Sequence, residues 1–158
     1  MDFFSPCWIA LAGMFTSAPS KTYLAKQITS FPERISVCNR VAERARERGI
    51  DPFLAISISF HETKFTYTDS NKGAKGPLGV LPKWHCPKKG KCDLIDAGID
   101  AIEKVLEIYP DDMCMALATY NRGFYGKCEK GRTEYIYAQN VMNLYSILCA
   151  STDLCHTC

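Results

Sequence analysis

The stretch DPFLAISISFHE, residues 51–62, predicts a helix that is buried on most of its sides. Asp51 is suited to cap this helix, because its carboxylate can accept hydrogen bonds from the first free backbone N–H groups, and Pro52 fits the first helical position. Beyond them, apolar side chains fill most positions as far as Phe60. A helix that is apolar nearly all round must be surrounded by other elements, so we expect this segment in the core.

Amphipathic helices are predicted on both sides of this segment. Apolar residues recur at helical spacing between Ile35 and Ala45, among Glu and Arg residues that we interpret as a solvated face, and this helix ends at Gly49. The same spacing predicts helices over residues 94–109, 112–122 and 133–149. Glycines and prolines favour loop or short strand over residues 66–92. The sequence therefore predicts a mainly α single domain with a Gly-rich loop or short β region between its helices.

The composition is that of one compact globular domain. The chain has 158 residues, of which 47% are hydrophobic and 23% charged, and no residue type dominates any stretch. This excludes collagen-like, low-complexity and disordered proteins. The net charge is +2. Because proteins that bind DNA or RNA usually carry a larger excess of Lys and Arg, nucleic acid is not expected as a partner, whereas the mild basicity suits a polyanion such as a cell wall.

Nine cysteines indicate either an oxidising compartment or a metal site. Cys86 and Cys92 enclose a lysine-rich turn and are predicted to form a disulfide that closes a small loop. The alternative is zinc, bound by His85 with these two cysteines or by the cysteines and histidine of residues 149–158, although neither set has the paired CxxC spacing of common zinc sites. The remaining pairings cannot be read from the sequence.

The N-terminal region holds an apolar stretch, residues 3–15, followed by the small residues 16–18. This pattern predicts a secretory signal cut near Ala18, an uncleaved anchor, or a helix packed on the domain; the stretch is short for a bilayer span, and no basic residue precedes it. Cleavage near Ala18 would remove Cys7 and leave an even number of cysteines. The three alternatives stay open at this point.

Glu62 ends the apolar helix and is the candidate acid. A carboxylate beside Phe60 and Phe65 is costly to ionise, so its pKa should be raised. A carboxylic acid that stays protonated near neutral pH can donate a proton to the leaving oxygen when a glycosidic bond breaks. The alternative is a structural or solvated glutamate at a helix end.

Several motifs around Glu62 occur together in one order. They are GIDPFL at residues 49–54, ETKF at 62–65, SNKGAKG at 70–76 followed by Pro82, ALATYNRG at 116–123, and Tyr137 with Val141. Together they span roughly residues 33–148, and the set resembles the soluble lytic transglycosylases, relatives of the goose-type lysozymes. The resemblance implies a lysozyme-like catalytic domain at residues 33–149, after a signal peptide or N-terminal anchor at residues 1–18 and before a Cys-rich tail at residues 150–158.

The resemblance also implies a mechanism in which Glu62 acts first as general acid and then as base. It protonates the oxygen between N-acetylmuramic acid and N-acetylglucosamine in peptidoglycan, and the muramyl 6-hydroxyl attacks its own anomeric carbon to leave a 1,6-anhydro end. Because an intramolecular nucleophile has a high effective molarity, one acid suffices. No cofactor and no metal are expected.

Five further residues are given roles by the resemblance. Tyr120 and Asn121 would line the cleft and hydrogen-bond the N-acetyl groups, and Tyr137 would help to hold Glu62. Ser70 and Gly76 would shape the loop on the opposite wall, where glycine lets the backbone approach the glycan. The alternative for both tyrosines, which lie at helical spacing, is that they fill the core.

The chain departs from the family pattern on the loop after Glu62. Gly79 stands where the family has a glutamine that reaches the substrate, the spacing from Glu62 to the next motif is one residue shorter, and Thr63 replaces serine. Two alternatives therefore remain: a lysozyme-type hydrolase that uses Asp69 as a second carboxylate, and a non-catalytic peptidoglycan-binding or structural module. His61 is interpreted as an ordinary, partly exposed histidine.

The expected partner is the glycan strand of peptidoglycan, bound by a monomer that is exported to the periplasm or cell wall or carried in a virion. A small wall-cleaving domain suits a secretion or conjugation machine, whose components would then be partners, or a phage that uses it for entry or lysis. A zinc-binding interaction protein is a more distant alternative.

Overall fold

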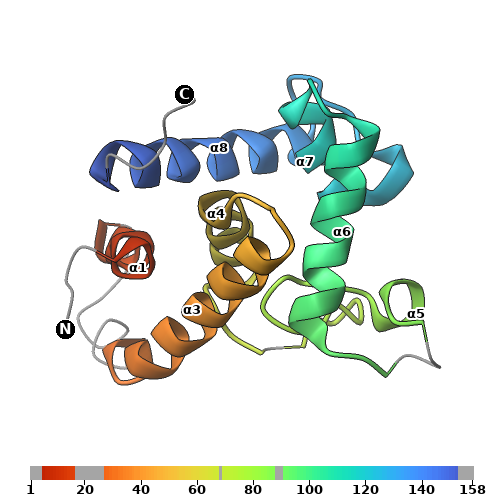
Figure 1. Cartoon of the computed structure of the whole chain (residues 1–158). Helices are drawn as coiled ribbons and strands as arrows, with labels where there is room; N and C mark the ends of the chain where they lie inside the picture. The colour runs from red at the N-terminus through yellow and green to blue at the C-terminus, as the bar shows by residue number, and fades with distance from the viewer. Residues whose placement is uncertain (1–4, 17–26, 68, 88–90, 153–158) are drawn as a thin grey trace.

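The structure, a computed structural model, describes residues 5–16, 27–67, 69–87 and 91–152 and is mainly helical, which confirms the predicted fold class (Figure 1). Its helices are α1 (Pro6–Thr16), α3 (Phe31–Glu47), α4 (Pro52–Thr63), α5 (Pro82–His85), α6 (Leu94–Ile108), α7 (Met113–Arg122) and α8 (Thr133–Thr152), with the 3-10 turn η1 (Gly123–Tyr125). An antiparallel bridge between Lys75 and Val80 lies in the loop between α4 and α5. The single turn α5 falls within the segment predicted to be loop or short strand.

Helix α4 lies at the centre of the fold, as its sequence predicts. Figure 1 shows it between α3 and α8, and it also contacts α1. Asp51 caps it, because one carboxylate oxygen accepts a hydrogen bond from the backbone N–H of Phe53 at 2.9 Å. The seven consecutive residues 53–59 are all buried. Full burial of one large apolar side chain stabilises a fold by about 1.5–3 kcal/mol, so the buried side chains of α4 contribute substantially to the stability of the core.

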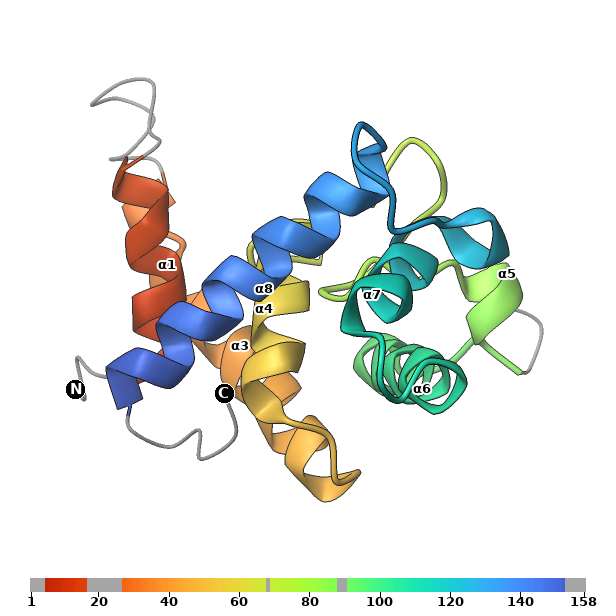
Figure 2. The same ribbon diagram turned by 90° about the horizontal axis from the view of Figure 1, so that it is seen from above.

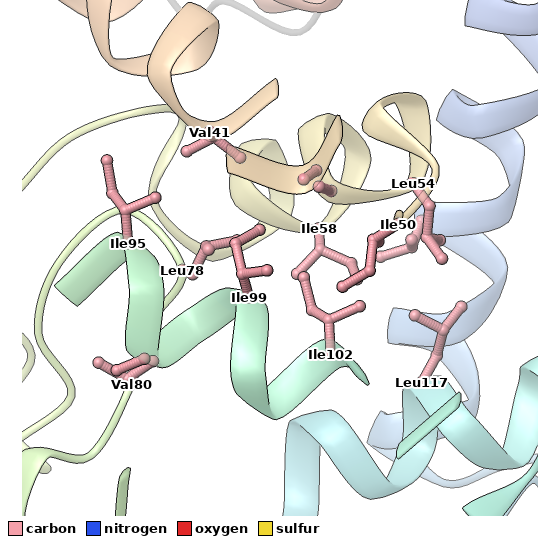
Figure 3. Packing of buried hydrophobic residues seen from close by; sticks show 14 of the residues in the cluster. Val41, Ile50, Leu54, Ile58, Leu78, Val80, Ile95, Ile99, Ile102 and Leu117 are labelled. Carbon is pink, nitrogen blue, oxygen red and sulfur yellow. The ribbon is translucent and has the colours of Figure 1, made fainter. Parts of the chain in front are cut away.

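Two apolar clusters pack against opposite sides of α4. One joins α4 to α3, α6, α7, the first half of α8 and the loop before α5. Figure 3 shows Ile58 of α4 close to Ile99 and Ile102 of α6 and to Leu78 of the loop. The other joins α4 to α1, α3 and the second half of α8. The first cluster fixes the loop 76–80 against the end of α4, where Glu62 lies.

The charged face of α3, predicted to be solvated, also forms ion pairs with α6. Arg44 pairs with Asp96 of α6, and Arg48 pairs with Asp100 and Glu103 of the same helix, all at 2.5 Å. These side chains are between about one third and one half exposed, so each pair adds little stability. The pairs link α3 to α6.

In the structure, the apolar N-terminal segment forms helix α1, which packs on the domain. Helix α1 contacts α3, α4 and α8, and its side chains Cys7, Ala10, Leu11 and Met14 are buried. Cys7 forms a disulfide with Cys38 of α3, with their Cα atoms 5.9 Å apart. The proposed cleavage point at Ala18 lies outside the described residues, but a cut there would leave α1 tied to α3 through this disulfide. No helix of the described residues is long and apolar enough to cross a membrane.

The predicted disulfide between Cys86 and Cys92 is confirmed. Cys114 pairs with Cys128, and Cys149 is also disulfide-bonded. The alternative of a zinc site at His85, Cys86 and Cys92 is therefore wrong, because a disulfide leaves no thiolate to ligate the metal. Within the described residues, no cluster of three or more His, Cys, Asp or Glu side chains could hold a metal ion. Residues 153–158 of the Cys-rich tail lie outside the described part of the chain. The disulfides fit a protein that folds in an oxidising compartment.

Candidate functional site

Three side chains from three helices meet at the end of α4. Glu62 comes from the last turn of α4, Tyr120 from the last turns of α7, and Tyr137 from the first turns of α8. The Tyr137 hydroxyl donates a hydrogen bond to Glu62 Oε1 at 2.8 Å, although the two residues are 75 positions apart in the chain. Tyr120 reaches the same place and donates to the backbone carbonyl of Leu78 at 2.6 Å. The structure thus brings together the predicted acid and both predicted tyrosines.

The carboxyl of Glu62 is held in a form that can donate a proton near neutral pH. Burial raises its pKa from near 4.5 to about 7, and the hydrogen bond from Tyr137 offsets part of this effect because it favours the ionised form. Burial, and then the nearby charge of Glu62, raise the pKa of both Tyr120 and Tyr137 well above 10. Both tyrosines therefore remain neutral hydrogen-bond donors while Glu62 titrates.

The loop beside Glu62 is fixed by hydroxyl groups from two helices. Ser59 and Thr63 both donate to the carbonyl of Pro77, at 2.9 and 3.0 Å, and Tyr120 binds the next carbonyl, that of Leu78. Thr63 therefore keeps a hydroxyl in use at the position where the family motif has serine. Ser59 was not predicted as a site residue; its signal in the sequence was a hydroxyl within an apolar helix, three residues before Glu62.

Gly79 lies directly against the second oxygen of the Glu62 carboxyl group. A Cβ atom at this position would come within 2.5 Å of Glu62 Oε2, and Gly79 has a φ of +63°, which disfavours any other residue. The glycine therefore allows the loop to approach Oε2 and leaves that oxygen free of side-chain cover from this position. A glutamine side chain in place of Gly79 would collide with the acid in this arrangement.

The backbone turns sharply just after Glu62. Lys64 and Phe65 have positive φ values of 54° and 64°, a conformation that costs about 1–3 kcal/mol for each non-glycine residue. Phe65 is fully buried, and Arg34 donates to the carbonyl of Lys64 at 2.9 Å. These two contacts offset the strain, and the turn lets Glu62 stand at a helix end while Phe65 enters the core.

The other predicted site residues lie apart from Glu62 or expose their side chains. Asn121 is exposed on the last turn of α7, next to Tyr120. Ser70 is exposed, and its hydroxyl accepts hydrogen bonds from the backbone of its own turn, at Lys72 and Ala74. Gly76 is buried, and a Cβ there would come within 2.6 Å of Leu94 Cβ. Gly76 therefore permits packing against α6, which differs from the predicted approach to a glycan.

Asp69, the candidate second carboxylate, and His61, the neighbour of Glu62 in the chain, have other contacts. The carboxylate of Asp69 is mostly exposed and lies 3.6 Å from Lys75 Nζ. The ring of His61 packs edge-on against Phe60, with the ring centroids 5.4 Å apart, and burial lowers the pKa of His61. A neutral, packed His61 agrees with its interpretation as an ordinary histidine.

A pocket of about 580 Å³ lies away from these residues, between the turn joining α3 to α4 and helices α6, α7 and α8. Asp51 is one of its acidic lining residues, but one oxygen caps α4 and the other accepts a hydrogen bond from Tyr145 at 2.6 Å. The carboxylate is therefore occupied by structural contacts. The group best prepared for chemistry is Glu62, outside this pocket.

Comparison of the chain with protein-family models, with curated proteins and with solved structures finds no match.

Proposed function

We propose that the protein cleaves the β-1,4 bond between N-acetylmuramic acid and N-acetylglucosamine in peptidoglycan, acting as a lytic transglycosylase. The observation that carries the proposal is the Glu62 carboxyl group, which has a pKa of about 7 and is held by Tyr137 at the end of a buried helix. The motif order that resembles the lytic transglycosylases adds support, because its acid and both of its tyrosines meet at this point.

The geometry suggests which oxygen carries the proton. Tyr137 donates to Oε1, so in the neutral acid the proton lies on Oε2, the oxygen next to Gly79. This proton passes to the glycosidic oxygen as the bond to the muramyl anomeric carbon breaks, and N-acetylglucosamine leaves with its hydroxyl restored.

The second half of the reaction returns the proton to Glu62. The carboxylate takes the proton of the muramyl 6-hydroxyl, whose oxygen forms a bond to the anomeric carbon and closes the 1,6-anhydro ring. No water is consumed, and the acid is regenerated. Because the nucleophile belongs to the substrate, one carboxyl group can serve both steps, and Tyr137 stabilises the carboxylate between them.

Analysis of the released products tests this proposal. Purified peptidoglycan would be digested in water enriched in ¹⁸O, and the muropeptides weighed by mass spectrometry, with Glu62→Gln as the control protein. We expect anhydro ends that lack one water and carry no ¹⁸O, and no products from the control. Reducing ends that contain ¹⁸O would instead establish a hydrolase, and wall binding without products would establish a binding module.

The setting follows from the substrate. A protein that acts on peptidoglycan works on the wall side of a membrane, in the periplasm, in the cell wall or from a virion, and the disulfides suit such a compartment. We propose that the protein acts as a monomer and that components of a secretion machine or of a virion are its partners.

A further inference from the structure

Two adjacent aromatic side chains are almost fully exposed just beyond the candidate site. Phe124 is 89% exposed and Tyr125 is 83% exposed, and both lie in η1, which follows α7 directly. In Figures 1 and 2 the chain that follows α7 lies at the edge of the molecule opposite α1. Aromatic rings are among the largest apolar groups of a protein, and leaving a pair of them in water forfeits their burial. Such a pair on a surface marks a binding contact.

The turn that carries these rings, residues 123–126, is held close to α7. Gly123 adopts a φ of +72°, and the backbone N–H of Gly126 donates to its carbonyl at 2.9 Å. A Cβ on Gly126 would come within 2.2 Å of the Ala118 carbonyl oxygen, so the chain returns directly along α7. We call residues 123–126 the aromatic turn. Gly126 lets the backbone pack tightly on α7 and Gly123 allows the positive φ of the turn, while both rings are exposed.

Covalent and polar contacts fix the chain directly after the aromatic turn. Cys114 in the first turn of α7 is joined to Cys128 by a disulfide that spans 14 positions. The buried carboxylate of Glu134, at the start of α8, accepts hydrogen bonds from the Lys127 backbone and from Arg132. The rings are thus presented by a rigid support, which lowers the entropy lost when a ligand binds.

The chemistry around the aromatic turn matches one ligand class. Exposed Arg122 and Lys127 flank it, and the exposed amide of Asn121 precedes it on the same helix end as Tyr120. A pyranose ring has an apolar C–H face that can pack on an aromatic ring, and its muramyl substituents end in carboxylates that pair with Arg and Lys. Both features occur together in peptidoglycan strands.

We propose that the aromatic turn is an accessory binding site for a saccharide unit of the peptidoglycan strand beyond the bond that is cleaved. This site rests on the proposed function, because the aromatic turn directly follows the end of α7 that carries Tyr120 and Asn121. It gives the protein a preference for long strands over short fragments, since a short fragment does not reach Phe124 and Tyr125.

The test removes both rings and compares long with short substrate. The double variant Phe124→Ser/Tyr125→Ser alters only exposed side chains, so folding is preserved. The matched control, Ile108→Ser/Ile147→Ser, removes apolar side chains that are 51% and 53% exposed elsewhere on the molecule. Affinity is measured by co-sedimentation with insoluble peptidoglycan, with each pair placed in the Glu62→Gln protein, and turnover is measured with the intact acid on insoluble peptidoglycan and on a tetrasaccharide.

Loss of the rings is expected to weaken co-sedimentation by about tenfold, with a larger loss of turnover on insoluble peptidoglycan than on the tetrasaccharide. The control pair should bind and turn over like the wild type. Equal losses on both substrates, or unchanged co-sedimentation, would overturn the accessory site while leaving the cleavage reaction intact. Ring-dependent co-sedimentation of a protein that releases no products would support the site and reject the enzyme. A wild-type protein that does not bind the wall would reject the site.

Discussion

Replacing Tyr137 by phenylalanine should raise the pKa of Glu62. The change removes only the hydroxyl that donates to Glu62 Oε1 at 2.8 Å and leaves the ring on α8. This hydrogen bond favours the ionised carboxylate, so its loss makes ionisation harder. A hydrogen bond to a charged group contributes about 1.5–3 kcal/mol, which corresponds to about one to two pKa units. The pKa of Glu62 should therefore move from about 7 to about 8 or above.

The assay is the pH dependence of kcat/KM for the release of anhydro ends. The acid step requires protonated Glu62, so activity of the wild type falls as the pH rises through about 7. In Tyr137→Phe this basic limb should lie higher by at least about one pH unit, while the maximal rate falls because the carboxyl group has lost a contact that orients it.

Tyr145→Phe is the matched control. It removes a comparable hydrogen bond from a tyrosine to a carboxylate, that of Tyr145 to Asp51 at 2.6 Å on the same helix α8, and leaves the contact between Tyr137 and Glu62 in place. Its basic limb should coincide with that of the wild type. The reasoning is refuted if the limb of a folded Tyr137→Phe protein is unchanged or lower, or if the control moves by the same amount.

Three further variants test the charges and the loop. Glu62→Gln should abolish cleavage and also alter stability. Folding raises the pKa of Glu62 from near 4.5 to about 7. The free energy of unfolding of the wild type is therefore highest below pH 4.5 and falls by at most about 3 kcal/mol as the pH rises through 7. Urea unfolding should then show that the variant becomes more stable relative to the wild type as the pH is raised from acidic to alkaline. If the stability difference between the two proteins does not change with pH, the burial of the acid is contradicted. Gly79→Ala should reduce kcat by at least about tenfold, since its Cβ would come within 2.5 Å of Glu62 Oε2. The control is Gly73→Ala, because Gly73 also has a positive φ but a Cβ there would meet no atom within 4 Å, so only backbone strain is added. Equal losses of kcat in the two variants would reject the role of the contact between residue 79 and Glu62. For Glu134, the hydrogen bond from Arg132 lowers the pKa to about 2. Its ionised carboxylate therefore stabilises the fold above its ordinary pKa, and this contribution is lost as the pH falls through about 2. Glu134→Gln should have a lower Tm than the wild type at neutral pH and the same Tm near pH 2, whereas a difference in Tm that persists in acid would argue against the ionised contact.

Most helix boundaries could be predicted because their signals are local. The helix predicted over residues 94–109 is Leu94–Ile108, and that predicted over residues 133–149 starts at Thr133 and ends at Thr152. Caps and apolar spacing act over about four residues, the span of one helical hydrogen bond. The turn α5 was missed because its four residues, none of them buried, are too few to show a helical period.

The candidate site could be predicted in part. Glu62 was recognisable as a carboxyl group at the end of an apolar helix, and its raised pKa agrees with that interpretation. The contacts that fix the loop could not be foreseen, because the acceptors are the backbone carbonyls of Pro77 and Leu78, which have no residue-specific signal. Gly76 was assigned to substrate approach from a motif, whereas its neighbour in space is Leu94.

The sequence by itself determined the mainly helical class, the central position of α4, the acid at its end and the disulfide between Cys86 and Cys92, since each depends on residues close together in the chain. The tertiary structure alone decided that α1 packs on the domain with Cys7 bonded to Cys38, 31 positions away. That Tyr137 holds Glu62 was implied by the family resemblance, but only the folded chain brings the two together across 75 positions. Local patterns fix where helices begin and end, but which faces meet depends on how the apolar surfaces of all the helices bury one another. The same packing gives Glu62 its raised pKa, because burial is a property of the assembled fold.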